Sequence, residues 1–145
     1  MANLISYRAG SLEQPNLEWS RVADTGVQGI ELNWSTDVTA AAIAAALTPH
    51  GLRLTSLGLG CPLDDDDLPA QFGQAAAVAA ELGAHYLFTS TRGDDMTLEA
   101  AAGKLQRLGD ATGPHKVSIA LETHPDLCTN AQTMKQTMAA VNHPW

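Results

Sequence analysis

Glu122 and His124 stand two residues apart at the end of residues 117–124, a segment in which small or polar side chains alternate with bulky apolar ones. In an extended strand, residues two apart point to the same side, so both would share one face with the small residues of the segment. A carboxylate beside an imidazole is a hard donor set that suits Mg²⁺, Mn²⁺, Co²⁺ or Zn²⁺. A carboxylate at the end of a buried strand needs compensation. We expect Glu122 to meet a metal or an interior cation such as Arg92.

Further candidate residues lie at or near the ends of other apolar, extended segments. Arg92 suits a phosphate or carboxylate group on a substrate, or a salt bridge to a neighbouring acid. Glu31 could bind substrate or support the sheet through hydrogen bonds. His124 could contact a substrate hydroxyl, or it could be a polar residue bonded to backbone. The other candidates would line a sugar pocket or pack at its rim, and they are Tyr7, Asn33 and Trp34.

Two conspicuous motifs are not expected to carry chemistry. Residues 64–67 are four consecutive aspartates, and carboxylates directly before a helix are favourable near its positive N-terminal end. We interpret them as a solvated helix start and not as a metal site. Gly58 and Gly60 lack the remaining spacing of a dinucleotide-binding loop, so they indicate backbone crowding at a strand end.

Five apolar, β-favouring segments alternate with helical patterns, as parallel strands joined by crossover helices do. The strand candidates are residues 4–8, 27–33, 52–58, 86–92 and 117–124. Apolar residues recur at helical spacing within residues 72–80 and 98–108. Helix N-terminal caps are expected at Ser35, Thr36 or Asp37, at Thr97, and at Thr129 or Asn130. Left-handed residues between a helix and the next strand are expected at Gly26, Gly51, Gly83 and Gly113.

This pattern predicts one α/β domain over residues 1–145, with no linker. Its strands suit either a five-stranded open sheet or the front portion of a (β/α)8 barrel, which takes about 250 residues in full. The turn after the first strand, residues 8–11, matches neither a dinucleotide-binding loop nor a P-loop, which favours the barrel. In such folds the working face lies at the C-terminal strand ends. That rule assigns one histidine, His124, to the working face and four to the far face: His50, His85, His115 and His143.

Composition excludes several classes of protein. A net charge of −8 and a pI near 4.8 oppose binding to a phosphate backbone, so nucleic acid is not an expected partner. There is no apolar stretch of the roughly 20 residues that a membrane helix needs. The first residues do not resemble a secretion signal, so a cytoplasmic location is expected. Cys61 and Cys128 lack zinc or disulfide spacing and should be reduced and structural.

Three segments resemble the sugar phosphate isomerase/epimerase family, the xylose isomerase-like TIM barrels: residues 29–32 (GIEL), 81–87 (ELGAHYL) and above all 120–130 (ALETHPDLCTN). The resemblance extends along essentially the whole chain. It implies a partial (β/α)8 TIM barrel of about five β/α units, with a divalent metal (Mn, Mg, Co or Zn) held by acidic and histidine ligands. The fifth-strand glutamate is the first ligand, and that role carries over to Glu122. The other ligands, an Asp, a His and a Glu on strands six to eight, have no counterpart in this sequence.

The resemblance implies a metal-dependent isomerase or epimerase of a small sugar, sugar phosphate or polyol. The metal would lower the cost of an enediolate while carboxylates, Glu122 among them, move a proton between neighbouring carbons. A metal-dependent lyase or dehydratase is the alternative within the superfamily, whereas an apurinic-site nuclease is disfavoured because strands two and three lack histidines. From another class, the chain could be a non-catalytic half-barrel module that acts only on assembly, since its open sheet edges invite a homo-oligomer. Alone, it is expected to be inactive.

Overall fold

Five parallel strands, in chain order, make up the single sheet. The structure is a computed structural model that describes residues 4–13, 17–93 and 96–145. The strands are β1 (Ser6–Arg8), β2 (Gly29–Asn33), β3 (Arg53–Pro62), β4 (Tyr86–Arg92) and β5 (Ser118–Leu121). The predicted α/β fold with parallel strands is therefore confirmed.

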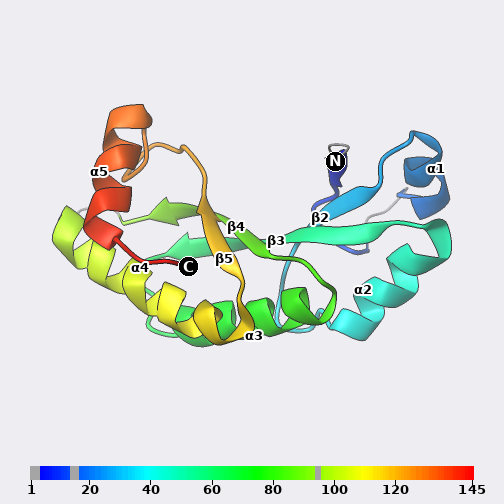
Figure 1. The fold of residues 1–145 in the computed structure, drawn as a ribbon, viewed down its shortest axis with the longest axis horizontal. Coiled ribbons are helices and arrows are strands. Elements are labelled where there is room, and N and C mark those ends of the chain that lie inside the picture. The colour runs from blue at the N-terminus through cyan, green and yellow to red at the C-terminus, as the bar shows by residue number, and fades with distance from the viewer. Residues whose placement is uncertain (1–3, 14–16, 94–95) are drawn as a thin grey trace.

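A helix follows each strand, as right-handed β/α units require. The helices are α1 (Trp19–Asp24), α2 (Ala40–Leu47), α3 (Leu68–Glu81), α4 (Leu98–Thr112) and α5 (Ala131–Val141). Figure 1 shows α2, α3 and α4 along the same side of the sheet, while the other side is open. Strands inside and helices outside is the arrangement of part of a (β/α)8 barrel.

The hydrophobic core fills the layer between the sheet and these helices. Every second residue of β2 and β4 is buried in it, and the small, alanine-rich face of α3 lets that helix lie close to the sheet. Its largest fully buried side chains include Ile30, Leu32, Leu57, Phe72 and Leu87. The residues that alternate with them on the strands must face the open side, and these are the polar residues of interest.

The C-terminal ends of two strands differ from the prediction. β3 continues to Pro62, four residues past the expected end, because its last residues pair with β4 up to Arg92. β5 stops at Leu121 instead of His124. The backbone leaves the sheet after Glu122, since the His124 amide donates to the Cys128 carbonyl within the following loop and not to β4.

The turn and cap predictions are partly right. Thr97 caps α4, and Asn130 caps α5 with a capping box. The cap of α2 is Thr39, not Ser35, Thr36 or Asp37, because the Ser35 hydroxyl donates instead to the Asp37 carboxylate in the preceding turn.

Three of the four glycines have the expected left-handed backbone: Gly26 (φ 83°), Gly51 (φ 68°) and Gly83 (φ 73°). Gly113 does not. It begins a 3₁₀ turn, Gly113–His115, that extends α4, and the left-handed residue is Lys116, with a φ of 58°.

Three of the other histidines, His50, His85 and His115, lie in the connections before β3, β4 and β5, at the far face, and His143 follows α5. The segment after α5 runs beside the free edge of β5, where the Ile119 amide donates to the Trp145 carbonyl over 2.6 Å. In the described part of the chain, no helix is both long and apolar enough to cross a membrane.

Candidate functional site

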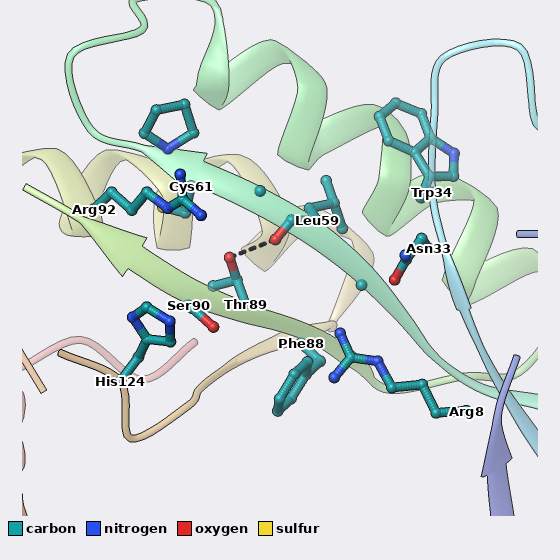
Figure 2. A pocket seen from close by; sticks show the side chains of 13 residues that line it. Arg8, Asn33, Trp34, Leu59, Cys61, Phe88, Thr89, Ser90, Arg92 and His124 are labelled. Carbon is teal, nitrogen blue, oxygen red and sulfur yellow. Dashed lines mark hydrogen bonds between the residues drawn. The ribbon is translucent and has the colours of Figure 1, made fainter. Parts of the chain in front are cut away.

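A hollow of about 460 Å³ lies on the open face of the sheet, toward the C-terminal ends of the strands. Figure 2 shows Arg8, Asn33 and Trp34 toward one side of it and Arg92 and His124 toward the other. The lining also includes Gly58, Gly60, Pro62, Phe88 and Ser90. The hollow therefore joins residues from every strand or from the loop that follows it.

The two glycines of β3 form the floor of the hollow. Gly58 pairs with Asn33 on β2 and with Phe88 on β4. A Cβ atom on Gly58 would lie 2.9 Å from Asn33 Oδ1, so the expected crowding is present there. On Gly60 a Cβ would meet only Pro62 Cδ, at 4.0 Å. The hollow is deep at Gly60 because this position has no side chain.

Glu122 lies directly after β5; it is not part of the lining of the hollow but bonds to Ser90, which is. Its backbone amide donates to the Thr89 carbonyl over 2.8 Å, which continues the strand pairing by one residue. This bond holds the backbone from which the side chain extends. The half-buried carboxylate accepts a 2.5 Å hydrogen bond from the Ser90 hydroxyl at Oε2. Among the described residues, none forms an ion pair with Glu122, and Oε1 has no hydrogen-bond donor. The carboxylate is thus oriented but retains one oxygen for a ligand.

His124 reaches the hollow from the loop after β5. Its Nδ1 lies 3.0 Å from the Pro125 carbonyl oxygen. Because a carbonyl can only accept, Nδ1 must carry the proton of this bond. The neutral imidazole then has a lone pair on Nε2, which could accept from a hydroxyl or ligate a metal.

Glu31 has a partner on each carboxylate oxygen. Oε1 lies 3.2 Å from Arg8 Nε, and Oε2 accepts a 2.6 Å bond from the Ser56 hydroxyl. The Arg8 guanidinium lies 5.2 Å from the centre of the Phe88 ring, at a distance where a cation and an aromatic face attract. This arrangement supports the structural interpretation of Glu31, while Arg8 itself lines the hollow.

Three other predicted substrate residues line the hollow: Arg92, Asn33 and Trp34. Arg92 and Asn33 are exposed, whereas Trp34 is half-buried against the core. The indole Nε1 of Trp34 has no hydrogen-bond partner among the residues that the structure describes.

Tyr7 is not brought together with the other candidates. It alternates with Arg8 along β1, so it points to the opposite side of the strand. There it lines a separate hollow with Leu17, Glu18 and residues of α1.

The polar or aromatic residues of the site that were not singled out from the sequence include Arg8, Ser90 and Phe88. The period of two along β4 places Phe88, Ser90 and Arg92 on one face, which was a usable signal for Ser90. The pairing of Arg8 with Glu31 depends on the alignment of β1 with β2, which the sequence pattern does not reveal.

The two cysteines are free and buried, as expected of structural thiols. Burial raises the pKa of the Cys61 thiol to about 12, although a hydrogen bond with Thr89 opposes the effect. Burial also raises the pKa of Cys128. Since the thiolate is the nucleophile, neither cysteine supplies one at neutral pH.

The donor chemistry fits one edge of a divalent-metal site. Glu122 offers a free carboxylate oxygen, and His124 offers Nε2. Within residues 4–13, 17–93 and 96–145, however, no three histidine, cysteine or acidic side chains are grouped closely enough to hold an ion. The acidic run at residues 64–67 is no exception, since Asp65 caps the turn before α3 and Asp66 pairs with Lys104 at 3.6 Å.

Comparison with solved structures shows the fold of this chain in longer proteins. The chain is similar to a D-allulose 3-epimerase from Methylomonas sp. (18% identity, TM-score 0.73), and the alignment covers 97% of this chain and 60% of that one. A xylose isomerase domain protein from Planctomyces limnophilus is similar at 14% identity and a TM-score of 0.77, with the same coverage of 97% and 60%. The IOLI protein, solved with a bound zinc atom, matches at 20% identity and a TM-score of 0.70, again covering 97% and 60%.

The chain thus spans about 60% of the length of these proteins. A search of curated protein sequences found no match. A family model described as the xylose isomerase-like TIM barrel matches residues 19–145, which is most of the chain. The chain therefore belongs to the xylose isomerase-like TIM barrel family.

Proposed function

We propose that this chain carries part of the active site of a divalent-metal-dependent isomerase or epimerase that acts on a small sugar or polyol. The observation that carries the proposal is the state of Glu122. Its carboxylate is half-buried at a strand end, is held by Ser90 at one oxygen, and has no described donor at the other. The D-allulose 3-epimerase and the zinc-bound IOLI protein support the assignment as proteins of the same fold.

A bound divalent metal would polarise the carbonyl oxygen of a sugar and the hydroxyl oxygen on the neighbouring carbon. The proton on that neighbouring carbon would then become more acidic. The chain's own residues have distinct tasks. Ser90 holds the Glu122 carboxylate in one orientation, which a ligand or a proton-transferring group requires. Nε2 of His124 accepts a hydrogen bond from a substrate hydroxyl. Arg92, at the rim, contacts an oxygen-rich or anionic part of the substrate.

Because the chain spans 60% of each compared structure, the complete site is proposed to include residues that these five strands do not supply. Mn²⁺, Mg²⁺, Co²⁺ and Zn²⁺ all accept a carboxylate ligand such as Glu122. The test therefore includes each of these four metals.

The test is deuterium incorporation into the substrate. The protein, as expressed from its own gene, is incubated in D₂O with each of the four metals and a panel of pentoses and hexoses. Proton transfer next to a carbonyl should place deuterium on that carbon, which NMR detects. Glu122→Gln should abolish the metal-supported incorporation, whereas Glu99→Gln, an exposed residue on α4, should leave it unchanged.

Two results would contradict the proposal. Incorporation into none of the sugars with any metal would exclude the reaction, and full activity of Glu122→Gln would exclude the role of this residue. Loss of water from the sugar, with deuterium in the dehydrated product and none in the remaining sugar, would instead identify the dehydratase alternative.

A further inference from the structure

Between Arg92 and His124, β4 and the chain after β5 lie side by side without backbone pairing. We call this unpaired boundary the seam. The register of the two strands ends at Thr89 and Leu121. Beyond this point β4 continues to Arg92, while β5 gives way to a loop. Besides the hydrogen bond of the Cys128 thiol with Thr91, two hydrogen bonds to carboxylates cross the seam there.

The first of these bonds joins Ser90 to Glu122, as described above. The second runs from the backbone amide of Gly93 to Oδ2 of Asp126. Gly93 is buried, and a buried amide without a partner is strongly disfavoured. The loop lies directly on this residue, since a Cβ atom on Gly93 would be 3.3 Å from Leu127 Cδ1. Asp126 therefore satisfies a donor that the end of the β4–β5 pairing leaves open.

Asp126 has an unusual backbone conformation. Its φ of 126° lies in the region that favours glycine, and within the described ranges only Lys116 and Asn142 share a positive φ among the other residue types. The Asp126 amide donates to Thr129 Oγ1 over 3.1 Å, and the Thr129 hydroxyl donates back to the Asp126 carbonyl over 2.8 Å. Glycine would adopt this backbone freely but would lack the carboxylate, so the strained aspartate points to a use of the side chain.

The loop that Asp126 fastens also carries His124. The His124 amide donates to the Cys128 carbonyl over 3.1 Å, so residues 124–128 form one closed turn. Gly93 directly follows Arg92. A bond between Asp126 and Gly93 therefore holds the turn that carries His124 against the strand end that carries Arg92.

We propose that Asp126 is a positioning residue that sets the separation of His124 and Arg92 across the seam, on one side of the hollow. The proposal deepens the proposed function, because it assigns the two side chains to one substrate. Asp126 itself acts through the Gly93 amide and does not touch the substrate.

Three variants of Asp126 distinguish the effect of losing the carboxylate from the effect of relieving the backbone strain. Asp126→Ala removes the acceptor and keeps the strain, Asp126→Gly removes both, and Asp126→Asn keeps an acceptor oxygen. Asn142→Gly is the matched control, because it relieves a positive φ at the end of α5, outside the hollow. The first readout is hydrogen exchange of the Gly93 amide by NMR in the full chain without ligand.

Loss of a hydrogen bond to a charged acceptor should speed this exchange about tenfold or more in Asp126→Ala and Asp126→Gly. The Gly93 exchange rate in Asp126→Asn should stay within about threefold of the parent rate, and the Asn142→Gly control should exchange at the parent rate. The amide signals of Arg92 and His124 should shift in the first two variants and return in Asp126→Asn. Asp126→Gly is compatible with the native backbone, so it tests the bond even where the alanine variant does not fold.

Unchanged Gly93 exchange in Asp126→Gly would overturn the proposal, and so would Arg92 and His124 signals that do not move. In the deuterium assay, the rate should fall about tenfold or more in Asp126→Gly and recover in Asp126→Asn. If the parent protein exchanges no sugar proton, the proposed function fails, while the Gly93 exchange still decides whether Asp126 fastens the seam.

Discussion

Replacing Glu31 by alanine should lower the free energy of unfolding by about 3 kcal/mol, because two interactions of different strength are lost. The Ser56 hydroxyl donates to the carboxylate over 2.6 Å and is only 9% exposed. A buried hydrogen bond to a charged group contributes about 1.5–3 kcal/mol. The Arg8 side chain is 55% exposed, so its ion pair with Glu31 adds at most about 1 kcal/mol.

The assay is equilibrium unfolding in urea, followed by circular dichroism, for Glu31→Ala, Ser56→Ala and the double variant. Ser56→Ala alone should cost about 1–2 kcal/mol, since Glu31 keeps Arg8 as a partner. The double-mutant cycle should give a coupling energy of about 1.5 kcal/mol between the two residues. The melting temperature of Glu31→Ala should fall by about 6–12 °C for a chain of this size. Glu81→Ala, an exposed control at the end of α3, should change neither quantity appreciably.

A coupling energy below about 0.5 kcal/mol, the usual limit for independent sites, would refute this reasoning. Glu31 would then not support the sheet through Ser56, and its role in substrate binding would become the better interpretation.

Three further predictions concern the hollow, the helix after β5 and the buried thiol. Gly60→Val should reduce deuterium incorporation more than about tenfold with little change in melting temperature, since the new side chain enters open space. Asn130→Ala should cost about 1 kcal/mol in urea unfolding, because it removes the capping box of α5. The stability of the parent should fall as pH rises from about 9 toward 12, because the unfolded Cys61 thiol ionises first while burial holds its folded pKa at about 12. Cys61→Ala should lose this part of the pH dependence.

The order of strands and helices was predictable because each segment carries its own local signal. Gly26, Gly51 and Gly83 mark turns that need a left-handed residue, and Thr97 stands directly before the apolar pattern of its helix. The start of α2 was not predictable, since several cap-forming residues precede it and hydrogen bonds within the loop choose among them. Gly113 was assigned wrongly because Pro114 favours a further 3₁₀ turn, which local pattern reading did not weigh.

The sequence suggested Glu122 and His124 through alternation along one strand, and their roles stay a prediction. His124 lines the hollow and Glu122 bonds to Ser90, which also lines it, although β5 ends before both residues. Contacts between strands could not be predicted, because they depend on register. The pairing of Glu31 with Ser56 follows a register shift between Ile30 and Glu31, which one sequence does not reveal.

The most direct test of the account is where Mn²⁺ binds. In ¹⁵N-labelled protein, a small amount of Mn²⁺ should first broaden the amide signals of Ser90, Glu122 and His124, and those of His85 on the far face should stay sharp. Glu122→Gln should remove the effect. Broadening confined to the acidic residues 64–67, or unchanged by Glu122→Gln, would contradict the assignment of Glu122 as a metal ligand.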